Sequence, residues 1–404
     1  MKLGAKNKKT LLLVTTLVLS LLLLVSCMGS GTVARGWAGV SEIDDALIFA
    51  SMTGKVYSVN SATGAVRGDP IKMVVPASGG LSCIPSCSGQ QTAAIAMYSS
   101  PGVAEDLVYF GGNDGKVYAY QLVDGKLKEE PLWTYPRQEN LGAAIIGGLV
   151  IADGKLFFST ANGTVYALTA AEGYKEWSYS IGEKIWSAPA VEGDTLYIGS
   201  FDKKVYALDS TTGAKKWEFE TGGAISATPL VKDGLVFIGS YDRHFYALDT
   251  NGELVWKFPA NDDATNTPRN WFWVKPILHN DVIYAPCLDG KVYVLNALTG
   301  SYIDAIDLIP DTANIDVAIS SSSILINDMM VVAATRLYKN SGSYIYKIDT
   351  VNGTRTELTR FNEGVNAPLF ANGEFVYLHT TRDNFYKVNL LSGEKTQITL
   401  TASK

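Results

Sequence analysis

The chain has 404 residues, of which 47% are hydrophobic, 11% aromatic and 18% charged, and its formal net charge is −6. This composition is typical of a globular protein, and the acidic balance argues against binding to nucleic acid phosphates. Three His and four Cys leave little material for a metal site, so we expect none.

Residues 1–26 have the pattern of an export signal. They contain four Lys and no acidic residue, residues 11–25 are almost wholly apolar, and the run ends in Leu24-Val25-Ser26-Cys27. A basic start, a short apolar run and small residues predict a cleavable signal peptide, and the alternative is an uncleaved anchor. The ending resembles the bacterial lipobox, which implies that Cys27 receives lipid and becomes the first mature residue.

Residues 27–36 are small and polar, and they predict a tether between this anchor and the body. Several acyl chains hold a protein to a bilayer where one chain would not. We therefore expect an exported protein, lipid-anchored to the outer face of a bacterial membrane, in the cell envelope or periplasm.

The body repeats one unit, whose shortest spacing of 40 residues occurs three times. The units are marked by eight pairs of a hydrophobic residue and Tyr, which are Val56-Tyr57, Val117-Tyr118, Val165-Tyr166, Val205-Tyr206, Phe245-Tyr246, Val292-Tyr293, Ile345-Tyr346 and Phe385-Tyr386. A repeat of this length indicates a stacked or ring-shaped architecture. The excess over 40 residues is explained by inserted loops.

Each unit contains four strand signals. In the fourth unit these are residues 185–191, 195–200, 204–208 and 214–220, which are rich in β-branched and aromatic residues and separated by turns. Asp114-Gly115 and Asp289-Gly290 supply the positive φ angles that tight hairpins need. No amphipathic helix separates the units. We predict an all-β, eight-bladed β-propeller of four-stranded antiparallel blades, forming one domain over residues 37–404.

The recurring pattern Asp/Asn-Gly-x-Val-Tyr-Ala-Leu-Asp, then Thr-Gly, then Trp resembles the PQQ-like repeat. This repeat builds the blades of quinoprotein dehydrogenases and of BamB-like outer-membrane assembly lipoproteins. The resemblance implies that the outer-strand tryptophans dock between adjacent blades, and these are Trp133, Trp177, Trp217 and Trp256. The first, sixth, seventh and eighth units lack this Trp, and the seventh has a longer hairpin loop.

The resemblance leaves three functions open. A quinoprotein dehydrogenase needs the quinone PQQ, a Ca²⁺-type site, an Asp base and often a disulfide between adjacent cysteines, but this chain has no adjacent Cys pair and no large insertions. We therefore expect a non-catalytic protein without cofactor, which binds protein partners or client chains and helps to assemble outer-membrane proteins. Quinone-dependent oxidation and binding of an extracellular carbohydrate or polymer are the alternatives.

Two cysteines, Cys83 and Cys87, lie on one inserted loop of the first unit. In an oxidising exterior such a pair most simply forms a disulfide, and metal binding is the alternative, although two Cys without a nearby His make only half a zinc site. Cys287 takes the place of Ser200 in its own unit, so we expect a buried strand residue rather than a nucleophile.

Four aromatic residues share one position before the hairpin. Counting back eleven residues from the first aromatic position of each hairpin gives Trp37, Tyr98, Trp186 and Trp273, and in other units Ile146, Ser226, Ser321 and Asn366. The inner strands of a propeller line its central channel. We predict an aromatic-rimmed funnel that grips an extended peptide or a flat ligand, and the alternative is that these rings only pack between blades.

Overall fold

The structure is a computed structural model, and it describes residues 38–76, 92–261, 266–308, 316–337 and 342–400. The chain divides into two units, residues 1–34 and 35–404, and only the second contains described residues. Cys27, Trp37, Cys83 and Cys87 therefore lie outside the described residues, as do the signal and the tether. No described segment forms a helix that is long and apolar enough to cross a membrane.

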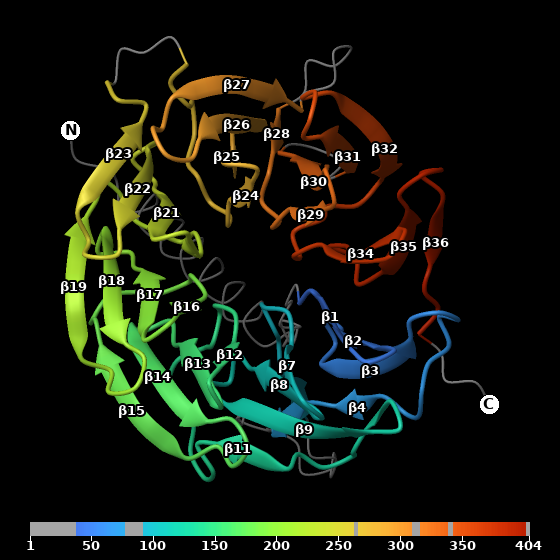
Figure 1. Ribbon diagram of the computed structural model, residues 1–404. Helices are drawn as coiled ribbons and strands as arrows, with labels where there is room; N and C mark the ends of the chain where they lie inside the picture. The colour runs from blue at the N-terminus through green and yellow to red at the C-terminus, as the bar shows by residue number, and fades with distance from the viewer. Residues whose placement is uncertain (1–37, 77–91, 262–265, 309–315, 338–341, 401–404) are drawn as a thin grey trace, which may run out of the picture. The chain divides into compact units, whose positions relative to one another are not determined.

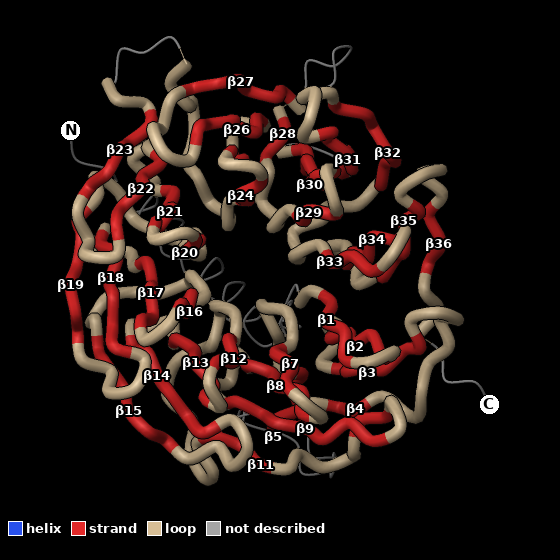
Figure 2. The backbone as a smooth tube through the Cα atoms, viewed as in Figure 1, coloured by secondary structure: helices blue, strands red, loops and turns tan. Residues whose placement is uncertain are grey.

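The described residues form eight antiparallel blades arranged in a ring, which confirms the predicted all-β propeller (Figure 1). In the described residues, strands alternate with loops and turns around the ring (Figure 2). The first strand of each blade lies nearest the centre and the last lies at the outside (Figure 1). Blade 2 divides its outer position between two short strands, and blade 7 divides its inner position in the same way.

The first four blades have the following strands. Blade 1 contains β1 (Val40–Ile43), β2 (Ala46–Ala50), β3 (Lys55–Asn60) and β4 (Ile71–Lys72). Blade 2 contains β7 (Gly102–Ala104), β8 (Leu107–Gly111), β9 (Val117–Val123), β10 (Lys126–Leu127) and β11 (Trp133–Tyr135). Blade 3 contains β12 (Val150–Ala152), β13 (Lys155–Ser159), β14 (Thr164–Thr169) and β15 (Lys175–Ser180). Blade 4 contains β16 (Ala190–Glu192), β17 (Thr195–Gly199), β18 (Lys204–Asp209) and β19 (Lys215–Glu220).

The other four blades follow the same plan. Blade 5 contains β20 (Leu230–Lys232), β21 (Leu235–Gly239), β22 (Phe245–Asp249) and β23 (Leu254–Phe258). Blade 6 contains β24 (Ile277–His279), β25 (Val282–Pro286), β26 (Lys291–Asn296) and β27 (Tyr302–Asp307). Blade 7 contains β28 (Val317–Ala318), β29 (Ile324–Ile326), β30 (Met329–Arg336), β31 (Ser343–Asp349) and β32 (Arg355–Phe361). Blade 8 contains β33 (Phe370–Asn372), β34 (Phe375–His379), β35 (Phe385–Asn389) and β36 (Lys395–Gln397), and outside the blades β5 (Val74–Pro76) pairs with β6 (Thr92–Ala94).

The second strand of each blade is buried on both faces because a neighbouring blade covers each side. All five residues of β17 are buried, for example. At its end, a Cβ atom on Gly199 would lie 2.2 Å from Cγ2 of Ile225, a buried residue of blade 5. Gly239 has the same relation to Phe272 of blade 6, at 2.3 Å. Glycine at this point of the repeat therefore lets the next blade approach closely.

The outer-strand tryptophans span the interfaces between blades. Each donates its indole Nε1–H to a carbonyl oxygen of the next blade's outer turn, in the pairs Trp133–Ala170 (3.2 Å), Trp177–Ser210 (3.1 Å), Trp217–Thr250 (2.8 Å) and Trp256–Ala297 (2.9 Å). Trp217 is half-buried, whereas the other three are 6 to 7% exposed. Each indole thus has both an apolar contact and a hydrogen-bond partner, as a buried Trp requires.

Blade 8 closes the ring directly onto blade 1. Nδ1 of the buried His379 lies 3.0 Å from the carbonyl oxygen of Ala38, and its Nε2 lies 2.9 Å from Asp383. The same carboxylate accepts the backbone N–H of Met52 at 2.7 Å. In the part of the chain that the structure describes, each blade uses strands from one stretch of sequence, so no exchanged strand closes the ring.

Candidate functional site

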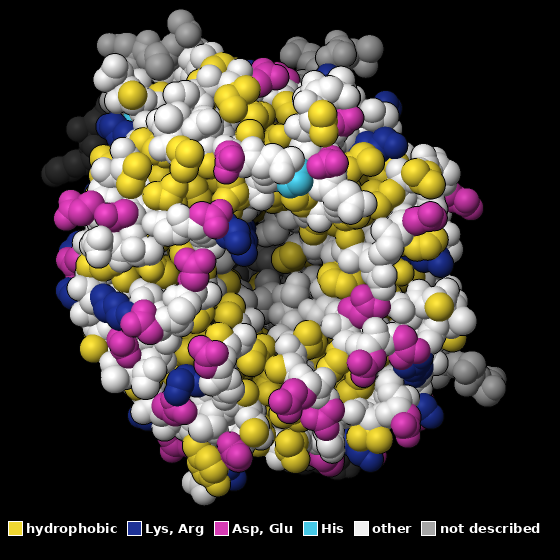
Figure 3. Space-filling model, viewed as in Figure 1, with side chains coloured by type: hydrophobic (Ala, Val, Ile, Leu, Met, Phe, Trp, Pro, Cys, Tyr) yellow, Lys and Arg dark blue, Asp and Glu magenta, His cyan; other side chains and the backbone are white. Residues whose placement is uncertain are grey.

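The centre of the ring encloses a cavity of about 650 Å³. Figure 3 shows the corresponding hollow, with acidic side chains spread around it on the face in view. The described lining comes from the segments that precede or begin the inner strands of blades 2 to 8, so this cavity is the place where seven blades present side chains to one space.

One set of the lining residues contains most of the positions given by the eleven-residue count. Its members are Tyr98, Ile146, Trp186, Ser226, Trp273 and Asn366. The rings of Trp186 in blade 4 and Trp273 in blade 6 meet edge to face, with centroids 6.2 Å apart. Blade 5 lies between them and contributes the small Ser226, which leaves room for this contact. Three of the four predicted aromatics therefore line one cavity, and the fourth, Trp37, lies outside the described residues.

In blade 7 the prediction was wrong by one residue. Ser321 is only 1% exposed, and its neighbours Ser320 and Ser322 line the cavity instead. The strand pairing explains the error. In blade 4 the count starts at Tyr197, which pairs with Ala207, and the equivalent residue of blade 7 is Val331, which pairs with Lys347. Counting eleven back from Val331 gives Ser320, and a shift of one residue turns a side chain to the other face.

The two tryptophans belong to a larger aromatic cluster. Tyr241 stacks on Trp271 at 4.4 Å and on Trp273 at 5.7 Å, and Phe201 packs on both Trp186 (4.7 Å) and Tyr241 (5.8 Å). Trp271 is 41% exposed and Trp186 is 37% exposed, so rings extend from the cavity to the surface. The sequence prediction missed Phe201, Tyr241 and Trp271. The first two stand directly before the hairpin Asp in blades 4 and 5, a repeat position that aligned units would have revealed.

A second set of lining residues lies two residues further along each segment, and its members are Ser100, Gly148, Ala188, Thr228, Lys275, Ser322 and Pro368. Lys275 is the single charged residue of the described lining. It is accessible to water, yet the surrounding walls desolvate its ammonium group and lower its pKa. No described residue forms an ion pair with it. The cavity thus combines aromatic faces, hydroxyl groups and one unpaired cation.

The repeated Asp residues of the hairpin turns have a structural role away from this cavity. Asp202 accepts the hydroxyl of Tyr206 at 2.5 Å and the backbone N–H of Lys204 at 3.0 Å. Burial and this carboxylate raise the pKa of Tyr206 above its ordinary value. Asp114, Asp242 and Asp289 accept equivalent bonds from Tyr118, Tyr246 and Tyr293. These carboxylates hold their own hairpins.

Cys287 is fully buried, and its thiol contacts the carbonyl oxygen of Asn270 at 3.3 Å. Burial raises the pKa of this thiol well above its ordinary value. Because the thiolate is the reactive form, the residue has the inert character of a core cysteine, as the sequence predicted.

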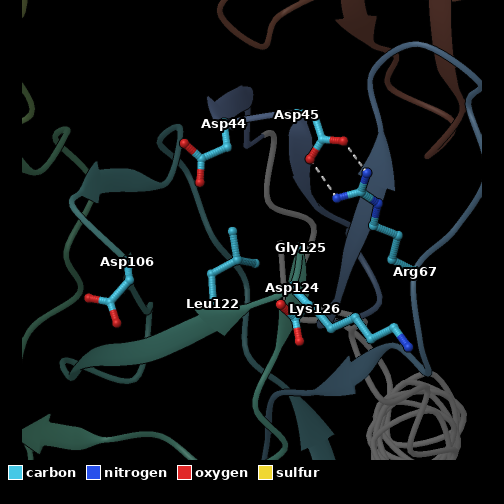
Figure 4. Close-up of a pocket in the computed structure, with 8 residues that line it drawn as sticks. All are labelled: Asp44, Asp45, Arg67, Asp106, Leu122, Asp124, Gly125 and Lys126. Carbon is cyan, nitrogen blue, oxygen red and sulfur yellow. Dashed lines mark hydrogen bonds and ion pairs between the residues drawn. The ribbon is translucent and has the colours of Figure 1, made fainter.

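A second hollow, between blades 1 and 2, is open and polar (Figure 4). Its lining is Asp44, Asp45, Arg67, Asp106, Leu122, Asp124, Gly125 and Lys126. Arg67 forms two bonds to Asp45, at 2.7 and 2.5 Å, which lower the pKa of the carboxyl and raise that of the guanidinium. An exposed pair of this kind contributes little to stability or chemistry.

The described residues do not fit a quinone and its metal. Bound PQQ would supply the electron acceptor for oxidation of an alcohol, and its metal needs carboxylate and amide oxygens. The described lining of the central cavity has Asn366 but no Asp or Glu. Across the described part of the chain, no three His, Cys, Asp or Glu side chains come together as a metal site would require.

Comparison with known proteins settles the family. A family model described as outer membrane protein assembly factor BamB matches residues 86–185 and 161–399. The chain belongs to this family. The match confirms the resemblance that the repeat suggested, and it covers most of the propeller. A search of curated proteins found no match.

Solved structures show the same fold at low sequence identity. BamB from Moraxella catarrhalis has a TM-score of 0.62 and 18% identity, over 87% of this chain and 95% of that one. The computationally designed Ika8 protein gives 0.66 and 13%, over 88% and 96%. The quinohemoprotein alcohol dehydrogenase ADHIIG from Pseudomonas putida HK5 gives 0.59 and 15%, over 73% and 65%. Such identities establish the architecture alone.

Proposed function

We propose that this protein is a non-catalytic binding propeller of the bacterial cell envelope, lipid-anchored through Cys27, which holds an extended segment of a partner polypeptide in its central cavity. The family supports the setting, because its description is that of an assembly factor for outer membrane proteins. The observation that carries the proposal is the lining of the cavity.

The lining suits binding better than catalysis. Trp186, Trp273 and Tyr98 offer flat apolar faces, which contribute large contact areas at a small cost in side-chain entropy. The hydroxyl groups of Ser226 and Ser320 donate to the carbonyl oxygen of Trp273 and to Asn366, and their oxygens can still accept hydrogen bonds from peptide N–H groups. Catalysis by general acid and base would need paired titratable groups within hydrogen-bond reach of one substrate, and the described lining offers only the Lys275 ammonium and the Tyr98 phenol, with no Asp, Glu or His.

The test is binding of fluorescent peptides, drawn from the strands of outer-membrane barrel proteins, to the purified exported protein. We expect Trp186→Ala combined with Trp273→Ala to weaken binding about tenfold or more, because two aromatic contacts are lost. The matched control is Tyr174→Ala, which removes an aromatic ring that is 60% exposed and does not line the cavity. It should leave binding unchanged.

Other results would refute the proposal. Unchanged peptide affinity in a folded double variant would remove the cavity from the binding site. Uptake of PQQ with Ca²⁺, followed by oxidation of an alcohol, would favour the dehydrogenase alternative. Binding of a polysaccharide by the same tryptophans, without any peptide binding, would favour the polymer alternative.

A further inference from the structure

A groove between blades 7 and 8 has features that the repeat does not require. It has a volume of about 430 Å³. Four turns meet there: the turn between β29 and β30, the turn between β33 and β34, and two outer turns. The two outer turns connect β31 to β32 and β35 to β36. Apolar lining comes from Ile326, Met329, Val351, Leu390 and Leu391.

The outer turns have one geometry around much of the ring. In blade 4 the N–H of Gly213 donates to the carbonyl oxygen of Asp209 at 2.8 Å, and the Asp209 side chain accepts the N–H of Thr212. In blade 8 Gly393 and Asn389 form the same bond at 2.9 Å, and Asn389 accepts the N–H of Ser392. The turn is therefore closed by its Asp or Asn and its Gly.

The residue at the tip of the turn takes no part in these bonds through its side chain, so its identity is free to vary. At this position the first, third and fourth blades have small or polar residues, which are Ala62, Ala171 and Thr211. The sixth, seventh and eighth blades have Leu298, Val351 and Leu391 instead, which are 63, 75 and 72% exposed. Because small and polar residues form the same turn, the turn itself does not require the exposed apolar residues of blades 7 and 8, and two of them side by side at one groove suit contact with another molecule.

The charge of the groove limits what that molecule can be. Its charged lining residues in the described chain are all acidic, Asp328, Asp349 and Glu374. Asp349 accepts the N–H groups of its own turn, and one oxygen of Asp328 contacts His279 Nε2 at 2.8 Å. Glu374 is exposed, so a negative charge lies beside the apolar lining residues. Such a groove matches an apolar side chain that is flanked by Lys or Arg, whose aliphatic stems add further contact.

We propose that the groove between blades 7 and 8 docks a segment of a partner protein in which one or two large apolar residues stand next to Lys or Arg. The apolar residues contact Val351 and Leu391, and the basic groups approach Glu374 and Asp328. This site is separate from the central cavity, and binding to it does not depend on the function proposed there.

The test begins with random displayed peptides selected on the intact mature protein, followed by affinity measurements with the selected peptides. We expect the selected sequences to combine large apolar residues with Lys or Arg. Val351→Thr combined with Leu391→Thr should lower their affinity about tenfold. Both turns should still form, since Thr211 occupies this position in blade 4. Glu374→Gln should weaken binding and its dependence on salt.

Two control variants make the result specific. Leu298→Thr removes an apolar residue that is 63% exposed at the same position of the turn in blade 6, outside the groove, and should leave affinity unchanged. The double variant Trp186→Ala and Trp273→Ala should also bind the peptides normally. The proposal fails if selection yields no binders, if binders lack basic residues, or if the groove variant binds them as the parent does. It also fails if the groove variant instead abolishes self-association of the chain.

Discussion

Docking of one blade onto the next can be tested with two glycines that differ in a single respect. Gly213 and Gly64 occupy the same position of the outer turn in blades 4 and 1, and both have a φ of 74°. A Cβ atom on Gly213 would lie 2.6 Å from the ring of Trp177, whereas a Cβ atom on Gly64 would meet nothing within 4 Å. The difference arises because blade 8, which precedes blade 1 in the ring, has no outer-strand Trp.

The expected magnitudes follow from these contacts. Alanine in the left-handed region costs about 1–2 kcal/mol, and part of this is offset because alanine restricts the unfolded chain. Gly64→Ala should therefore lower the free energy of unfolding by about 1 kcal/mol. Gly213→Ala should cost about 1–3 kcal/mol more, since the methyl group displaces the Trp177 ring. That displacement also strains the 3.1 Å bond from the indole to Ser210.

Urea unfolding followed by circular dichroism gives the measurement, with the midpoints compared at a common slope. A third variant isolates the contact, because in a Trp177→Ala background the cost of Gly213→Ala should fall to that of the backbone alone. Equal losses for Gly213→Ala and Gly64→Ala would refute the docking role of the tryptophan. The docking role would also be refuted if Gly213→Ala lowered the free energy of unfolding equally in the parent and in the Trp177→Ala background.

The remaining predictions concern the anchor, the inserted loop and the half-buried tryptophan. Cys27→Ala should abolish lipid labelling and the membrane-bound mature form, and unchanged fractionation would contradict the lipoprotein assignment. Cys83 and Cys87 should resist alkylation until reduced, so free reaction of both thiols in the exported folded protein would exclude a bridge. Trp217→Ala should lower the free energy of unfolding by about 2–3 kcal/mol, less than a fully buried Trp, because this indole is partly exposed; a loss well under ~1 kcal/mol would mark it as a surface residue.

The fold could be predicted from the sequence because each blade repeats the same local signals. Alternation of apolar residues marks β17 and β18, and the turn that follows β18 contains a Gly in every version of the unit. Blade 7 was the exception, since β30 and β31 are longer and the inner position is divided between β28 and β29. A count based on one aromatic position could not follow that irregularity, and it placed Ser321 on the wrong face.

The candidate site was predictable only in part. The offset from the hairpin located Trp186 and Trp273, because strand alternation fixes which face a residue occupies. It could not show that Ser226 leaves room for the two rings to meet across blade 5, nor that Phe201 and Tyr241 extend the cluster. Contacts of this kind depend on how the blades are arranged around the axis of the ring. The sequence of one repeat does not specify that arrangement.

Comparison of the blades separates residues that build the ring from residues that serve the site. Where a position closes a turn it recurs, as the positive-φ glycine represented by Gly213 does in the outer turn of every blade. Positions that face the cavity or the groove have no such structural role, and the residue types at these positions differ between blades. Trp186 is replaced by Ser226 one blade later, and Thr211 by Leu391 across the ring. A ring of eight blades needs eight similar interfaces between blades. A ligand without eightfold symmetry needs a binding surface on which the blades differ. Binding sites are therefore to be sought at positions where a blade departs from the repeated sequence.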